Sequence, residues 1–155
     1  MVDILIVEDD VHKRDQLVAF LSKGEESPSI EQAGSLIGGI RALRATKPDY
    51  VILDMTLPNY EPESDGHVGS VLAFGGVEFL RQVRRYKIET KVIVVTQFET
   101  FGDDDNAKDR KELDAELREQ FSNVYKGMVY YHASLSDWSD ELQNLLEQSF
   151  KEKGQ

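Results

Sequence analysis

The chain has 155 residues, of which 40% are hydrophobic and 30% are charged, and its formal net charge is −11. This length suits one domain with a core of its own, while the acidity disfavours direct binding of nucleic acid. Because the chain has no cysteine, no apolar run long enough to span a membrane and no secretory signal, we expect a cytoplasmic protein without disulfides or thiol chemistry.

Five segments are typical of strands, and each is followed by a segment typical of a helix. The predicted strands are residues 4–7, 29–32, 50–54, 91–96 and 129–131. The predicted helices are residues 11–21, a segment from Ser35 to the turn at 47–49, residues 77–86, residues 108–125 and a segment after Ser136. This alternation predicts one domain, with a five-stranded parallel sheet and helices on both of its faces.

Apolar residues at helical spacing predict which face of each helix packs inward. In the first helix these residues are Val11, Leu17, Val18 and Leu21. In the fourth helix they are Leu113, Leu117, Phe121 and Val124, and in the last helix Trp138, Leu142, Leu145 and Leu146. Gly24 and Gly127 are expected to end the first and fourth helices, and Asp9 or Asp10 can cap the first.

Polar residues stand where three of the predicted strands end. Glu8 and Asp9 follow the first strand, Asp54 ends the third, and Thr96 ends the fourth. Since parallel strands place their carboxyl ends at one edge of the sheet, we expect these side chains to converge. Crowded carboxylates with no nearby His or Cys favour Mg²⁺ as the neutralising cation. Such a carboxylate can also attack a phosphoryl donor, with the Thr96 hydroxyl donating to a phosphoryl oxygen.

Three stretches carry a resemblance to a known family. They are ILIVEDD at 4–10, KPDYVILDMTLP at 47–58 and VIVVT at 92–96, in this order and with predicted helices between them. On these stretches the chain resembles the response-regulator receiver family of two-component signalling, whose fold is a doubly wound, flavodoxin-like (βα)₅ sheet. The resemblance is close over residues 1–58, good over 76–96 and topological beyond.

The resemblance implies a role for each polar residue at the sheet edge. Asp54 would be the phosphoacceptor, and Glu8 and Asp9 the acidic pair that positions Mg²⁺. Thr56 would offer its backbone carbonyl to the metal, and Thr96 would be the switch hydroxyl.

The resemblance also implies a stand-alone signalling domain rather than an enzyme, capable at most of self-phosphorylation and autodephosphorylation. The phosphoryl group would come from a histidine kinase or a phosphotransfer protein, and an effector protein would read the phosphorylated state. A homodimer is possible, whereas nucleic acid and membranes are not expected partners. Nothing in residues 1–155 indicates an attached output domain.

The chain departs from the family at the fifth strand, where receivers carry a lysine that contacts the phosphoryl group. Residues 127–150 contain no lysine or arginine, and His132, Ala133 or Ser134 occupies the expected place. Lys126 precedes the predicted strand and would therefore lie at its far end. His132 is either a substitute donor to the phosphoryl group or a histidine with no special role.

Three further residues are candidate modulators. Gln97 stands where receivers usually have a small residue, and its amide could either block or orient a water molecule that attacks the acyl phosphate. Tyr130 and Tyr131 are candidates for the aromatic switch residue of the family, although one of two adjacent strand residues must face the core.

Two segments are longer than their counterparts in receivers. The first, about 59–75, is predicted to be a loop that forms a lid or contacts a partner, and Val71, Leu72 and Phe74 indicate that part of it packs. The second, about 99–126, begins with a polar stretch typical of a solvated loop. It is expected to enlarge the fourth helix and thereby alter the surface that receivers use for partners.

Two other functions remain open at this stage. A pseudo-receiver, which keeps the fold but serves as a phosphorylation-independent interaction module, is favoured by the absent lysine and the insertions, and disfavoured by the intact acids and Thr96. A Mg²⁺-dependent phosphatase of the haloacid-dehalogenase kind would need a second Asp two residues after the nucleophile, where this chain has Thr56.

Overall fold

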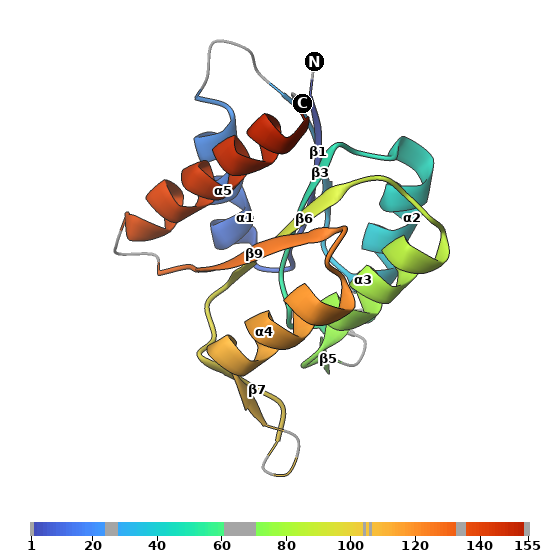
Figure 1. The fold of residues 1–155 in the computed structure, drawn as a ribbon, viewed down its shortest axis with the longest axis vertical. Coiled ribbons are helices and arrows are strands. Elements are labelled where there is room, and N and C mark those ends of the chain that lie inside the picture. Colours follow the sequence, from blue (N-terminus) through green and yellow to red (C-terminus); the bar gives the residue numbers. More distant parts are fainter. Residues whose placement is uncertain are drawn as a thin grey trace.

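A five-stranded parallel sheet forms the centre of the computed structural model, which describes residues 2–23, 28–60, 71–103, 105, 107–132 and 136–153. In the order β2-β1-β3-β6-β9, its strands are Ser29–Ala33, Asp3–Val7, Tyr50–Leu53, Lys91–Thr96 and Tyr125–Tyr130. The helices are α1 (Val11–Leu21), α2 (Leu36–Thr46), α3 (Gly75–Arg85), α4 (Arg110–Gln120) and α5 (Asp137–Lys153). Helices α1 and α5 cover one face of the sheet, and α2, α3 and α4 cover the other (Figure 1). The predicted doubly wound α/β fold is confirmed.

The central strands are buried on both faces, as their continuous apolar runs predict. One layer packs under α2, α3 and α4 and takes Leu5, Val7, Val51, Leu53, Val92 and Val94 from these strands. The other layer packs under α1 and α5 and takes Ile4, Ile6, Tyr50, Ile52, Ile93 and Val95. From α5 it receives the predicted inward residues Trp138, Leu142 and Leu146, with Leu145 partly buried beside them. Within the described ranges, no helix is long and apolar enough to cross a membrane.

The inward face of α1 differs from the prediction in its first turn. Leu17 is buried as predicted, but Val11 is 57% exposed and Lys13 is buried, with 1% of its surface exposed. The Asp10 side chain caps the helix, accepting hydrogen bonds from two N–H groups of the first turn at 2.9 and 3.2 Å. Lys13 lies four residues before the buried Leu17. Because residues four apart share a face of a helix, its side chain also points toward the sheet.

The last strand starts earlier than predicted. Gly127 lies inside β9 at a φ of +154° instead of ending α4, which stops at Gln120. The pairing of β9 with β6 shifts register beside Gly127, and such a shift exchanges the faces of the strand. Tyr125 therefore packs in the layer under α4, whereas Val129 packs in the layer under α1 and α5.

The two segments predicted to be insertions are joined at their ends by short antiparallel pairs. β4 (Leu57–Pro58) pairs with β5 (Val71–Leu72), and β7 (Thr100–Phe101) pairs with β8 (Lys108–Asp109). Leu72 and Phe74 pack against the core, as predicted. Residues 61–70, which make up most of the first insertion and include His67, lie outside the described residues, as does Gly24.

The prediction of an enlarged fourth helix is wrong. α4 has 11 residues, the same number as α1, α2 and α3. The extra chain instead contributes to the β7–β8 pair, which projects beyond α4 in Figure 1. Phe101 of this pair is 2% exposed, so the polar stretch is only partly the solvated loop that its composition predicts.

Candidate functional site

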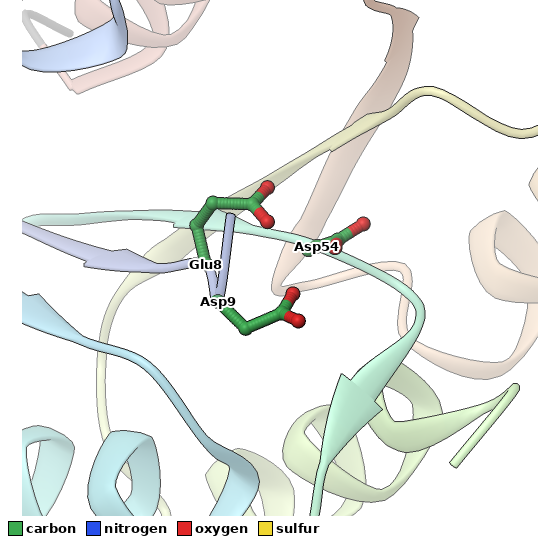
Figure 2. Close-up of side chains that lie close together, drawn as sticks. All are labelled: Glu8, Asp9 and Asp54. Atoms are coloured by element: carbon green, nitrogen blue, oxygen red, sulfur yellow. The ribbon is translucent and has the colours of Figure 1, made fainter. Parts of the chain in front are cut away.

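Three carboxylates meet at the edge of the sheet where β1 and β3 end. The backbone of Asp54 extends the pairing past β3, because its N–H donates to the Val7 carbonyl at 3.0 Å and so places Asp54 beside Glu8. Carboxylate oxygens of Glu8, Asp9 and Asp54 lie within 4.8 Å of one another, and Figure 2 shows the three groups gathered at one place. Glu8 and Asp54 are buried, whereas Asp9 is exposed. The structure thus brings together the acids that the sequence predicts to converge.

A lysine that sequence reasoning missed completes this cluster. The Nζ atom of Lys13 lies 2.5 Å from Glu8 Oε1 and 3.5 Å from Asp54 Oδ1, and it donates to the Val95 carbonyl at 2.7 Å. These two buried carboxylate oxygens accept no hydrogen bond of good geometry from the described residues, so their contact with Lys13 is ionic. The spacing of four residues between Lys13 and Leu17 is the signal that could have placed the lysine on the buried face.

The crowding shifts the pKa values of the three acids. Burial raises the pKa of Glu8 to about 7, against the opposing effect of the Lys13 ammonium. Loss of solvation, followed by the charge of Glu8, raises the pKa of Asp9 to about 6. Burial also raises the pKa of Asp54, again opposed by Lys13. The ionised cluster is therefore costly, and a bound cation would relieve it.

The donor set of this cluster fits a magnesium ion. It offers hard carboxylate oxygens from two strand ends, the ligands that Mg²⁺ prefers. Two of these oxygens are buried without a well-formed hydrogen bond, and three carboxylates against one ammonium leave two formal negative charges that a divalent ion would balance. Glu8, Asp9 and Asp54 are the side chains that would hold it.

Magnesium binding is expected to strengthen with rising pH. An acid whose pKa is raised in the folded state favours folding below its unfolded pKa, and this stabilisation is lost as the pH rises through the folded value. For Glu8 the window runs from 4.5 to about 7, so the metal-free domain should lose stability across it. Since Mg²⁺ binds the ionised carboxylates, its affinity should rise about tenfold between about pH 6 and about pH 8. Calorimetric titration at both pH values measures this, and an affinity that falls with pH would contradict the assignment.

Thr96 lies fully buried at the carboxyl end of β6. Its hydroxyl oxygen accepts a hydrogen bond from the Phe98 N–H at 3.2 Å, and its carbonyl accepts one from the Tyr131 N–H at 2.7 Å. Thr96 therefore links the site edge to the end of β9. Gln97, the next residue, is exposed, and its predicted influence on an attacking water molecule remains a prediction.

Thr56 lies two residues beyond Asp54 and is half-buried. Its hydroxyl donates to the Ala73 carbonyl at 3.4 Å, and the Gly76 N–H donates to the Met55 carbonyl at 2.9 Å. These bonds fix the turn after Asp54 against the start of α3. The predicted use of the Thr56 carbonyl as a metal ligand remains a prediction.

The two tyrosines at the end of β9 have different surroundings. Tyr131 is buried against Trp138, and its hydroxyl donates to the Gln16 side-chain oxygen. Tyr130 is half-buried, and the Arg110 guanidinium at the start of α4 lies 4.5 Å from the centre of its ring. Of the two tyrosines, only Tyr130 contacts α4 through Arg110, so a movement of Tyr130 could pass a change at the site to α4.

Of the residues predicted to replace the fifth-strand lysine, the structure describes only His132. His132 follows β9 and is exposed, whereas Ala133 and Ser134 lie outside the described residues. The prediction that Lys126 precedes the last strand is wrong, because Lys126 is the second residue of β9. It is still at the opposite end of the strand from the site.

A doubly wound sheet with a cluster of acids at the ends of its first and third strands is the arrangement that the receiver resemblance predicts. The chain belongs to the response regulator receiver family, because the model of the response regulator receiver domain matches residues 4–117. The match contains the three acids, Lys13 and Thr96. Receiver domains generally bind Mg²⁺ at such an acidic pocket.

Known proteins similar to this chain include two curated relatives and many solved receiver structures. The uncharacterized protein y4jR of Sinorhizobium fredii is 44% identical over 141 residues, which cover 90% of this chain and 93% of that protein. The Detocs response regulatory protein DtcB of Enterobacter cloacae is 32% identical over 141 residues, covering 90% and 94%.

Among solved structures, two illustrate the likeness of fold. The signal receiver domain of a putative Luxo repressor protein from Vibrio parahaemolyticus has a TM-score of 0.66 at 18% identity, covering 97% of this chain and 91% of that one. The response regulator domain of Thermotoga maritima CheB has a TM-score of 0.65 at 20% identity, covering 96% and 95%. At these identities the likeness shows the fold.

Proposed function

We propose that this domain accepts a phosphoryl group on Asp54 in a Mg²⁺-dependent reaction and signals by binding a partner protein. The observation that carries the proposal is the surroundings of Asp54. Its carboxylate is buried at the end of β3, beside two further acids and against a buried ammonium group. A carboxylate can act as the nucleophile toward a phosphoryl donor, and these surroundings support that role for Asp54.

The transfer requires little from the protein beyond position and charge. An Oδ atom of Asp54 attacks the phosphorus atom of the donor, the bond between phosphorus and the leaving atom breaks, and the leaving group keeps the electron pair. The product is an acyl phosphate. A bound Mg²⁺ would neutralise charge on the transferring group. Lys13 favours the ionised, attacking form of Asp54, and the Thr96 hydroxyl would donate to a phosphoryl oxygen.

The partners follow from the class of reaction. A histidine kinase or a phosphotransfer protein in the cytoplasm would donate the phosphoryl group, and an effector protein or a second copy of the chain would read the phosphorylated state. The similarity to DtcB, a response regulatory protein, supports a regulatory role rather than an enzymatic one.

A second candidate is a pseudo-receiver that binds its partner without phosphorylation. The observation in its favour is the chain that follows β9, where His132, Ala133 or Ser134 stands in place of the usual lysine. The two candidates differ in one measurable property, which is whether Asp54 takes up a phosphoryl group.

The test is incubation of the whole chain with Mg²⁺ and phosphoramidate, a small phosphoryl donor, followed by intact-protein mass spectrometry. We expect the mass of one added phosphoryl group, lost on treatment with hydroxylamine, which cleaves acyl phosphates. A chain whose mass never changes, with Mg²⁺ or without it, would favour the pseudo-receiver.

Thr96→Ala is expected to separate phosphorylation from its read-out. The variant lacks the hydroxyl but keeps the three acids, so its affinity for Mg²⁺ should match that of the unchanged chain within about twofold, while its response to phosphorylation is lost. Amide chemical shifts of β9 and α4, measured before and after phosphorylation, report this response. Thr96→Ser keeps the hydroxyl and should keep the response. Loss of Mg²⁺ binding in Thr96→Ala would show that the assigned role is wrong.

A further inference from the structure

Lys13 is a buried cation that the sequence pattern of receivers does not account for. Its side chain is 1% exposed, and its ammonium contacts acceptors from the ends of three different strands: Glu8 after β1, Asp54 after β3 and the Val95 carbonyl in β6. The Tyr131 ring beyond β9 lies 5.7 Å from the same nitrogen atom. Burying an ammonium group is costly unless it is paired, so these contacts fix its position closely.

This position is next to the atom that would be phosphorylated. Lys13 Nζ lies 3.5 Å from Asp54 Oδ1, and a phosphoryl group on Asp54 would add three oxygens with further negative charge at this end of the cluster. The ammonium can donate three hydrogen bonds, of which one goes to the Val95 carbonyl. The ion pair with Glu8 Oε1 at 2.5 Å occupies a second, which leaves the third for a phosphoryl oxygen.

Lys13 and a divalent ion would complement each other rather than compete. The three acids exceed Lys13 by two formal negative charges, and Asp9, the acid that is exposed, has no salt bridge to Lys13. A metal would therefore approach from the Asp9 side, while the ammonium holds the buried side between Glu8 and Asp54.

We propose that Lys13, in the first turn of α1, is the cation that contacts the phosphoryl group on Asp54. It would take the place of the lysine that is absent from the end of β9. The inference rests on the proposed function, because it assigns a residue to that same site. In the unphosphorylated domain Lys13 pairs with Glu8 and Asp54, and after transfer it keeps Glu8 and pairs with a phosphoryl oxygen.

The test compares Lys13→Met with the unchanged chain. Methionine keeps most of the length and volume of the side chain but has no charge. Phosphorylation by phosphoramidate should slow about tenfold or more, as expected on loss of a charge-assisted hydrogen bond to the transferring group. Mg²⁺ affinity should stay equal or increase, because a positive charge has left the cluster. Lys23→Met, at an exposed position after α1, is the matched control and should behave like the unchanged chain.

A direct readout uses beryllium fluoride, which mimics a phosphoryl group on Asp. In protein carrying ¹⁵N-labelled lysine, the ammonium signal that disappears in Lys13→Met should shift when beryllium fluoride is added with Mg²⁺. A purely structural ion pair would not produce a shift of this signal together with slower phosphorylation.

Should Lys13→Met not fold, the single variant Glu8→Gln is compared with the double variant that carries Lys13→Met and Glu8→Gln. Removing Lys13 together with its nearer partner leaves fewer buried charges unpaired than removing Lys13 alone. A folded variant without Lys13 that reacts as fast as its parent would overturn the inference while leaving the proposed function intact. If the unchanged chain takes up neither phosphoryl group nor beryllium fluoride, both are overturned.

Discussion

Asp54→Asn is expected to abolish phosphorylation and to raise the stability of the metal-free domain. Asn has the shape of Asp but cannot form an acyl phosphate, so the loss of the phosphorylated species should be complete. The gain in stability follows from charge. Burial raises the pKa of Asp54, and the substitution removes one of three crowded acids while Lys13 keeps its shorter contact, 2.5 Å, with Glu8. We expect a gain of about 1 kcal/mol, or about 2–4 °C in melting temperature for a domain of this size.

The matched control is Asp15→Asn, which removes an exposed carboxylate from the same protein. Its stability should change by less than about 0.5 kcal/mol, and it should be phosphorylated normally. A thermal melt and an intact mass measured on both variants give the comparison. If Asp54→Asn were less stable than the unchanged domain in the absence of metal, the acids would not be crowded in the way described. If it still gained a phosphoryl group, the acceptor would be another residue.

Gly76→Val is expected to damage both the fold and the site. Gly76 lies in the first turn of α3, where a Cβ atom would come within 2.9 Å of the Asp54 carbonyl oxygen and 3.0 Å of Met55 Cα. Both are backbone atoms and cannot rotate away. Overpacking of this kind costs about 1–3 kcal/mol, and relief of the clash requires movement of the turn that carries Asp54. Phosphorylation should therefore slow even in the fraction of molecules that remains folded.

Denaturant unfolding and the phosphoramidate reaction, measured on one preparation, separate the two effects of this substitution. Ala19→Val places the same side chain at an exposed position of α1 and should cost only about 0.5 kcal/mol through helix propensity. A Gly76→Val domain as stable and as reactive as Ala19→Val would contradict the close packing of α3 under the acceptor strand.

The acids of the site could be predicted from the sequence because each stands at the end of a continuous apolar run. Such runs define strands, and parallel strands align their ends at one edge, so Glu8, Asp9 and Asp54 converge whatever the details of the helices. The Asp10 cap was also predictable, since a short acid before a helix satisfies its first N–H groups.

Lys13 could not be identified in the same way. The apolar residues of α1 predict that Val11 faces inward and assign no place to the lysine, whereas Val11 is exposed and Lys13 is buried. Two of its partners are far away in the sequence, Val95 by 82 positions and Asp54 in the acceptor strand region, so the burial of its charge depends on tertiary structure. The same cause explains β9, where Lys126 and Gly127 weaken the strand pattern and pairing with β6 overrides it.

The most direct test of the account is NMR of the ¹⁵N-labelled chain during titration with Mg²⁺ and then with beryllium fluoride. We predict that Mg²⁺ shifts the amide signals of Asp9 and Asp54, and that beryllium fluoride then shifts Thr96, Tyr130 and the start of α4. That result would mean that Asp54 takes a phosphoryl-like group and that β6 and β9 transmit the change. Spectra that respond to neither addition would contradict the phosphoacceptor role and leave the domain a constitutive docking module.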